Sequence, residues 1–321
     1  MILQTTNEVM YEKDEFIIAF IKESKTHKQI EIDLNTEGPC LVHIGLVALL
    51  DNLTAVLGVD KSRITIKTNN LVKSSDYTEI CGYTSLQGQV LVACERMTPT
   101  LSNLSSRIGI FIGRSNWIRL GLASYIFSNC ENPTMTFHYD SSYEYHRGHL
   151  GLNRIIFEEW ADRHMVYALL DNVPMTYDLI QSYPIADDTV FNMGALYNDL
   201  FCEVICETFY NGNVFYPTEK IFRCMVAKRP FIVQGPKWFL KNLHILGFKT
   251  FNHWWPEAYD GDPEDTRYST ITGLIDMIES QEQAIINKWY IEMQPTLEHN
   301  YNMLVNMSVS RMRDTEFYVD S

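Results

Sequence analysis

The stretch that decides the fold runs from residue 200 to residue 251. It reads LFCEVIC at 200–206, TEKIFRCMVA at 218–227, FIVQ at 231–234, KWFLKNLHIL at 237–246 and KTF at 249–251. The short apolar runs predict buried strands, and the longer segments between them have the spacing of helices. Strand, helix, strand, helix and strand within roughly fifty residues predict a right-handed parallel sheet.

The same alternation occurs earlier in the chain. A helix from Leu41 to Leu57 lies between predicted strands at 30–34 and 63–67, and a strand at 108–112 precedes a helix from Trp117 to Phe127. The polar segment 98–107 is typical of a linker. Residues 271–312 have a helical pattern throughout. We therefore expect an α/β protein of two Rossmann-like domains facing a cleft, residues 1–104 and 105–321, with closing C-terminal helices.

Composition excludes several classes of protein. The chain has 321 residues, of which 46% are hydrophobic, so two globular domains are expected and little disorder. A net charge of -14 disfavours sequence-independent nucleic-acid binding, although a local basic groove is compatible with it. No stretch reaches the ~18 apolar residues of a membrane span, and the first residues lack the apolar run of a signal peptide. We expect a cytoplasmic protein with no membrane partner.

The segment after the strand at 200–206 carries the chemistry. Glu207 directly follows this strand, and the sequence Pro-Thr-Glu-Lys at 217–220 opens the next helix. Ligands of open α/β sheets gather at the carboxyl ends of the strands. There, Glu219 can accept hydrogen bonds from a ribose diol, and the Lys220 ammonium can meet a diphosphate. The structural alternative is that the same residues form a helix cap and a solvated lysine.

This segment resembles the nucleotide-sugar motif of the α-1,3-fucosyltransferase family and, more closely, glycosyltransferases of phages and giant viruses. In that motif an acidic residue ends a strand, Tyr-x-Thr-Glu-Lys opens a helix, and a strand that contains Pro ends in Gly. The matching residues are Glu207, Tyr216, Thr218, Glu219, Lys220 and 230–235. The resemblance extends over 200–267. It departs at 208–209, which read Thr-Phe in place of Asn-Ser, and at Phe215, where Asp is usual.

The resemblance implies a glycosyltransferase of the two-domain GT-B kind, located in the host cytoplasm if the chain is viral. Residues 105–321 would bind the nucleotide sugar, and residues 1–104, which show no resemblance, would lie on the acceptor side. Thr218 belongs to the donor-binding motif, Glu219 would bind the ribose, Lys220 the phosphates, and Tyr216 and Glu207 would shape the donor pocket.

A second match lies at the start of the helix that begins at Trp117. Ser115 and Asn116, with Arg119 downstream, are similar to the family's Ser-Asn and its Arg that meets the diphosphate. Arg119 lies further from Lys220 in sequence than the family spacing. A structural role for Arg119, as an ion-paired or snorkelling residue on an apolar helix, is equally compatible with the pattern.

We expect no metal and no cofactor other than the nucleotide-sugar co-substrate. No Asp-x-Asp pair follows an apolar strand, and the seven cysteines contain no Cys-x-x-Cys pair. Without a metal ion, arginine and lysine must neutralise the leaving diphosphate. If the transfer inverts the anomeric centre, Glu95 is the candidate catalytic base. His146 and Arg147, in a polar aromatic loop, are candidates for acceptor or donor contacts.

The acceptor stays open at this point. One alternative is a hydroxymethylated pyrimidine of phage DNA, and the other is a glycan or a small molecule. A different class of function is a non-catalytic protein that binds nucleotide or DNA on a degenerate GT-B fold. A dinucleotide-dependent dehydrogenase is disfavoured because no Gly-x-Gly-x-x-Gly sequence opens a predicted helix.

Overall fold

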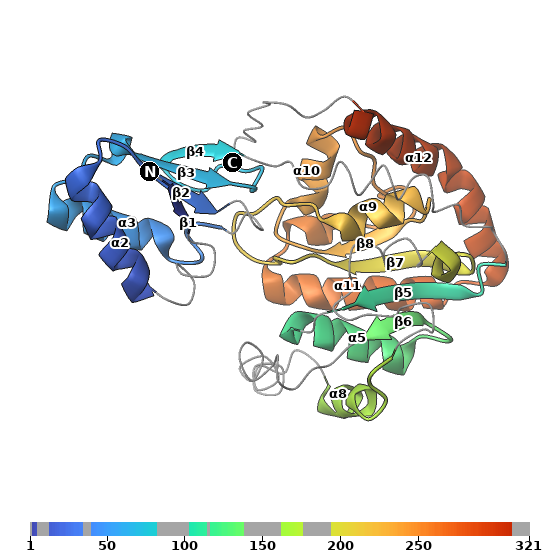
Figure 1. Cartoon of the computed structure of the whole chain (residues 1–321). Helices are drawn as coiled ribbons and strands as arrows, with labels where there is room; N and C mark the ends of the chain where they lie inside the picture. The colour runs from blue at the N-terminus through green and yellow to red at the C-terminus, as the bar shows by residue number, and fades with distance from the viewer. Residues whose placement is uncertain are drawn as a thin grey trace. The chain divides into compact units, whose positions relative to one another are not determined.

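The computed structural model describes residues 2–4, 13–34, 40–81, 103–113, 116–137, 162–175 and 194–309. The chain is an α/β protein with two parallel sheets of four strands each (Figure 1). It divides into two compact units. Unit 1 comprises the described residues up to Cys81 and the loop Thr208–Tyr216, and unit 2 comprises the described residues from 103 to 309 without that loop. The predicted α/β class with parallel sheets is confirmed.

Unit 1 is built on a sheet whose strands follow the order of the chain. The strands, each parallel to the next, are β1 (Ile2–Gln4), β2 (Ile30–Leu34), β3 (Ile64–Thr68) and β4 (Thr78–Cys81). Helix α2 (Lys13–Thr26) links β1 to β2, while α3 (Leu46–Leu57) and the short helix η1 (Lys61–Arg63) link β2 to β3. Right-handed crossovers that all step in one direction place their helices on one face, so α2 and α3 lie in contact on the same face.

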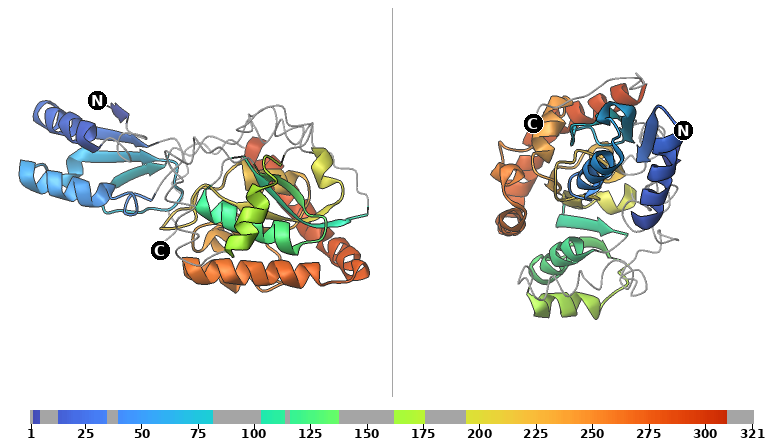
Figure 2. Two further views of the ribbon diagram at one scale, coloured as in Figure 1. Left: turned by 90° about the horizontal axis from the view of Figure 1, so that it is seen from below. Right: turned by 90° about the vertical axis from the view of Figure 1, so that its left-hand side faces the viewer.

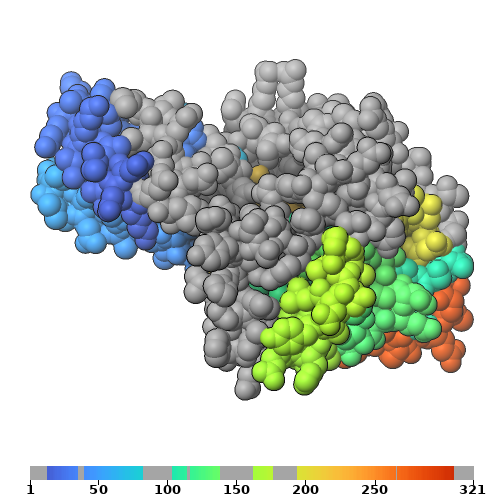
Figure 3. All heavy atoms as spheres, turned by 60° about the horizontal axis from the view of Figure 1, so that its bottom comes forward, coloured from blue at the N-terminus to red at the C-terminus, as the bar shows by residue number. Residues whose placement is uncertain are grey.

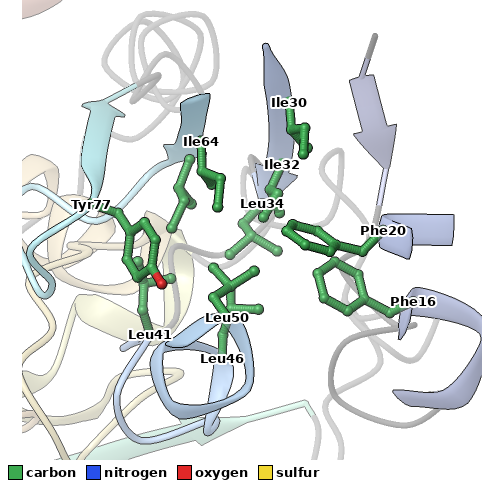
Figure 4. Close-up of a cluster of buried hydrophobic side chains, with 11 residues drawn as sticks. Phe16, Phe20, Ile30, Ile32, Leu34, Leu41, Leu46, Leu50, Ile64 and Tyr77 are labelled. Atoms are coloured by element: carbon green, nitrogen blue, oxygen red, sulfur yellow. The ribbon is translucent and has the colours of Figure 1, made fainter. Parts of the chain in front are cut away.

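The core of unit 1 lies between this face and the two helices (Figure 4). Every second residue of β2 and β3 is buried, which is the period of a sheet covered on one side. On the other face, Glu31 and Lys67 form an ion pair at 2.6 Å. The buried cluster comprises Phe16, Phe20, Ile30, Ile32, Leu34, Leu41, Leu46, Leu50, Ile64, Ile66 and Tyr77. Strand alternation and two amphipathic helices therefore account for this unit.

In the parallel sheet of unit 2, the direction in which successive strands are added reverses at the centre. Its strands are β5 (Ser106–Ile112), β6 (Thr134–Phe137), β7 (Leu200–Cys206) and β8 (Phe231–Gln234), in the order β6-β5-β7-β8. The chain steps from β5 to β6 through α5 (Trp117–Asn129), and from β7 to β8 through α9 (Glu219–Val226), as Figures 1 and 2 show. Because these right-handed crossovers run in opposite directions, α5 and α9 lie on opposite faces. The boundary between β5 and β7 is thus a topological switch point.

The remaining helices cover both faces of this sheet. Helix α11 (Glu264–Glu279) packs beside α5, where the Tyr268 hydroxyl donates to the Gly121 carbonyl at 3.1 Å, and α12 (Gln283–Val309) packs against α9. Helix α8 (Arg163–Leu170) lies beside α5 at the surface (Figure 3). Helix α10 (Phe239–Ile245) follows β8 and contacts the short helix η3 (Ala258–Gly261). Strands β7 and β8 are buried along their whole length, as expected for a sheet covered on both faces.

The loop Thr208–Tyr216 leaves β7 but belongs to unit 1. The buried Asn70 accepts the Phe215 N–H at 2.8 Å, and its amide donates to the Asn213 carbonyl at 3.0 Å. Gly212 turns the loop with φ of 72°, which glycine adopts without a steric penalty. The predicted division at 104/105 assigned this loop to the C-terminal domain, whereas the structure groups it with unit 1.

Most predicted elements lie close to their predicted positions. The strands at 30–34, 108–112, 200–206 and 231–234 and the helices predicted at 117–127 and 218–227, which are α5 and α9, are confirmed. The helix predicted from Leu41 begins at Leu46, because Gly45 adopts a left-handed φ of 75°. The predicted helical stretch 271–312 is interrupted at 280–282, between α11 and α12. No helix in the described ranges has both the length and the apolar character needed to cross a membrane.

The predicted strand at 249–251 is wrong. A side chain of α12 occupies the backbone groups that a neighbouring strand would bind. The amide oxygen of Asn300 accepts the Lys249 N–H at 2.8 Å, and its amide nitrogen donates to the Lys249 carbonyl at 2.8 Å. Asn300 is 1% exposed, and its two hydrogen bonds join the segment after α10 to α12.

Replacing Asn300 with alanine should lower the free energy of unfolding by about 1–3 kcal/mol, because the two hydrogen bonds between its buried side chain and the Lys249 backbone are lost. Urea unfolding measures this difference. Asn287→Ala, on an exposed position of the same helix, is the matched control and should change stability by less than about 0.5 kcal/mol. Equal stability of the two variants would contradict the role given to Asn300.

Candidate functional site

The candidate site lies at the carboxyl edge of the unit 2 sheet, around the switch point. Gly113 follows β5 and Glu207 follows β7, the two central strands. In open α/β sheets, ligands bind where the crossovers depart to opposite faces. The first turns of α5 and α9 both begin at this edge, so residues 116–119 and 218–220 are the side chains that the fold presents there.

Arg119 lies at the end of β7, although it belongs to α5. Asn116 caps this helix, since its Oδ1 accepts the Arg119 backbone N–H at 2.9 Å. The Arg119 guanidinium donates to the Glu207 carbonyl at 3.1 Å and to the Cys206 carbonyl at 3.4 Å. Arg119 is only 9% exposed. A nearly buried positive charge therefore stands at the switch point.

Glu207 and Thr218 join the end of β7 to the start of α9. The two carboxylate oxygens of Glu207 accept the Thr218 N–H at 3.3 Å and the Thr218 hydroxyl at 2.5 Å. Both residues are buried. The Thr218 hydroxyl oxygen also accepts the Lys220 backbone N–H at 3.4 Å, as an N-cap does. The carboxylate of Glu207 therefore fixes the first turn of α9, which carries Glu219 and Lys220.

Lys220 and Glu219 form a charged pair on this turn. The Lys220 ammonium lies 2.9 Å from Glu219 Oε1 and donates to the Thr218 hydroxyl oxygen at 3.1 Å. The Lys220 side chain is 18% exposed and that of Glu219 is 41% exposed. The ammonium therefore folds back over the helix start, and the carboxylate of Glu219 remains accessible from solvent.

The two carboxyl groups have opposite pKa shifts. Burial raises the pKa of Glu207, and it outweighs the opposing effects of the Lys220 charge and the Thr218 hydrogen bonds. Burial also acts to raise the pKa of Glu219, but the Lys220 charge and hydrogen bond outweigh it and lower that pKa to about 2. At neutral pH, the Glu219 carboxylate is therefore ionised and can accept hydrogen bonds from a diol.

A buried ion pair holds α9 against β7. The Arg223 guanidinium donates to the Glu203 carboxylate at 2.7 Å and to the Tyr197 hydroxyl at 2.6 Å, and this hydroxyl donates to the other Glu203 oxygen at 2.6 Å. None of the three residues is more than 4% exposed. The sequence signal for this cluster is a single charge inside each of two apolar segments, and sequence reasoning missed it.

The structure brings together six of the eleven predicted site residues. Six of them lie in unit 2 at the start of α5, the end of β7 or the start of α9: Asn116, Arg119, Glu207, Thr218, Glu219 and Lys220. Tyr216 is half-buried and belongs to the loop that groups with unit 1. Four further predicted residues lie outside the described residues: Glu95, Ser115, His146 and Arg147.

Gln234 is a residue at this edge that the sequence did not single out. It ends β8, is fully buried, and its backbone carbonyl accepts the Glu207 N–H at 3.0 Å. Within the part of the chain that the structure describes, neither polar atom of its side-chain amide has a hydrogen-bond partner. A polar residue that closes an otherwise apolar strand is the only sequence signal for it.

The aromatic and acidic run 254–260, which the family resemblance includes, has a structural role. Trp255 and Tyr259 are buried, and the Tyr259 hydroxyl oxygen accepts the Val233 N–H at 3.2 Å. The Asp260 carboxylate accepts the N–H groups of Leu240 and Lys241 at 2.8 and 3.0 Å. These contacts join the segment to β8 and to the first turn of α10.

Metal ligation is not apparent in the described ranges. There, no three His, Cys, Asp or Glu side chains are grouped so that they could hold a metal ion. The site carries two cationic side chains, Arg119 and Lys220. The metal-free chemistry expected from the sequence stays a prediction.

Glu207→Ala should lower the free energy of unfolding by about 1–3 kcal/mol, because the buried N–H and hydroxyl of Thr218 lose their acceptor. Glu207→Gln should cost less. Since the folded state raises the pKa of Glu207, the charged form is the costlier one in the fold, and Glu207→Gln should gain stability relative to the natural protein as pH rises through that pKa. Urea unfolding at several pH values measures both effects. A pH-independent difference would contradict the burial of this carboxylate.

Comparison with known proteins adds no assignment: no protein-family model, no curated protein and no solved structure matches this chain.

Proposed function

We propose that the chain is a metal-independent glycosyltransferase of the GT-B kind, which moves a sugar from a nucleotide-sugar donor to an acceptor hydroxyl. The observation that carries the proposal is the convergence of Arg119, Lys220 and Glu219 at one switch point from two different crossover helices. Parallel α/β sheets in both units are compatible with the GT-B arrangement. Unit 2 would then bind the donor.

The charges of this edge suit a nucleoside diphosphate. Glycosyl transfer builds negative charge on the leaving diphosphate, and preorganised positive groups stabilise that charge. In this proposal the Arg119 guanidinium and the Lys220 ammonium meet the phosphates, and the Glu219 carboxylate accepts hydrogen bonds from the ribose hydroxyls. Glu207 and Thr218 act as positioning residues, because their side chains are bonded to each other.

Burial argues against the structural alternative of a solvated lysine at a helix start. The side chain of Lys220 is 18% exposed, compared with 32% for Lys228 and 67% for Lys288. Thr218 alone completes the cap of α9, so capping does not require the charged pair that follows it. The ammonium is instead held close to the sheet edge, where a diphosphate would lie.

A second candidate function is a non-catalytic nucleotide- or DNA-binding protein on a degenerate GT-B fold. The observation in its favour is that neither carboxylate in the described part of the site is suited to act as a catalytic base. Glu207 is buried against Thr218, and Glu219 is paired with Lys220, so neither is placed to take the proton of an acceptor. The proposed base, Glu95, lies outside the described residues. Turnover therefore decides between the two functions.

Lys220→Ala should weaken the binding of a nucleoside diphosphate about 10- to 150-fold, because one charge-assisted hydrogen bond is lost. Isothermal titration with a panel of nucleoside diphosphates in excess chelator measures the affinity. The matched control is Lys228→Ala on the same segment, whose ammonium pairs with Glu298 at 2.6 Å. Unchanged affinity in Lys220→Ala, with an intact fold, would remove Lys220 from the site.

With the correct donor and acceptor, the protein should release nucleoside diphosphate at the same rate with or without chelator. The assay crosses a panel of nucleotide sugars with hydroxymethylated-pyrimidine DNA, free sugars and oligosaccharides. Donor binding without release or transfer for any acceptor would support the non-catalytic alternative. Loss of activity on chelation would contradict the metal-free mechanism.

A further inference from the structure

Trp238 is a partly exposed aromatic residue on a strained backbone, just past the carboxyl end of β8. Its φ of 66° and ψ of 22° lie in the left-handed region, where a bulky residue is rarely found. The residue is 46% exposed. Partial burial gives little compensation for this conformation, and strain of this kind concentrates at functional positions.

Several contacts fix the turn that presents Trp238. The Trp238 N–H donates to the Asp260 carbonyl at 2.7 Å, and the Asp260 carboxylate accepts the N–H groups of Leu240 and Lys241. The edge of the indole lies against Gly261, where an added Cβ would lie 2.7 Å from a ring carbon. The ring is therefore held in place from one edge.

Two ammonium groups flank this ring. Lys237 Nζ lies 5.2 Å and Lys241 Nζ 5.3 Å from the centroid of the indole, and both lysines are exposed. The nearby carboxylate of Asp260 is largely buried and engaged with backbone N–H groups. In a chain with a net charge of -14, these two ammonium groups place positive charge beside an aromatic face.

We propose that Trp238, Lys237 and Lys241 form a docking site for a single-stranded nucleic acid. A base would stack on the indole, and the neighbouring phosphates would draw the two ammonium groups away from the ring. Non-specific single-strand binding combines these two features, an aromatic platform and adjacent positive charge. One stacked base on an open surface is a weak contact, which favours a strand with several contacts over a free nucleotide.

The docking site shares a sheet edge with the proposed donor site. Three residues lie between Gln234 and Trp238, so the two Cα atoms, four residue steps apart, are separated by at most ~14 Å. The Gln234 carbonyl is bonded to the Glu207 N–H, next to Thr218 and Lys220. The suggestion that an acceptor strand lies in the docking site rests on the proposed transferase function. The binding of a single strand at this site does not depend on that function.

The test measures binding of a fluorescein-labelled oligothymidylate of twelve nucleotides to the full chain, by fluorescence anisotropy over a series of salt concentrations and without donor. Trp238→Gly should weaken binding about 10-fold or more while leaving the fold intact, because glycine adopts the left-handed conformation freely. Lys237→Ala/Lys241→Ala should lower the steepness of log K against log salt by about 1.4, the value for two phosphate contacts on a single strand. Ile245→Ala, exposed on α10, and Lys288→Ala, exposed on α12, are the controls and should bind as the natural protein does.

Three results would overturn the proposal. The first is equal affinity of Trp238→Gly and the natural protein for the oligonucleotide. The second is equal affinity for heparin, with no dependence on Trp238, which would indicate simple attraction of polyanions. The third is equal affinity for thymidine monophosphate, which would indicate a mononucleotide site. Since no donor is present, these outcomes are independent of the Lys220→Ala test.

Discussion

The buried ion pair between Glu203 and Arg223 is the contact on which the architecture of unit 2 depends. A charge removed from water is costly unless a partner offsets it, and here Tyr197 completes the hydrogen bonding of both groups. Strand β7 and helix α9 cannot slide past each other without breaking this cluster. Helix α9 therefore has one position on the sheet, and so do the residues at its start.

The proposed site lies beyond this ion pair, at the carboxyl end of β7. There, the Glu207–Thr218 hydrogen bonds join the two ends of the loop Thr208–Tyr216, where the chain leaves unit 2 and returns to it. The loop can therefore be bound by Asn70 of unit 1 while the start of α9 stays attached to β7. The charges of Lys220 and Glu219 lie on the first turn of α9, and Arg119 reaches the same edge from the opposite face of the sheet.

The sequence predicted the local features of the fold and the site. Strands β7 and β8 are apolar throughout, and Asn116 and Thr218 are helix caps that few residues can replace, so their positions follow from short segments. Features that depend on distant partners were missed. The charges of Glu203 and Arg223 interrupt apolar runs without indicating that they meet, and nothing in residues 249–251 indicates that Asn300 binds the Lys249 backbone. Helix α2 was also missed, since its apolar face is evident only once Phe16 and Phe20 pack on a sheet.

A crystal structure of the protein with a nucleoside diphosphate, grown in the presence of a chelator, tests the central claim most directly. The account predicts a diphosphate at the carboxyl ends of β5 and β7, within hydrogen-bonding distance of Arg119 and Lys220, with the ribose hydroxyls on Glu219. A nucleotide bound elsewhere, or at this edge with neither cation near its phosphates, would contradict it.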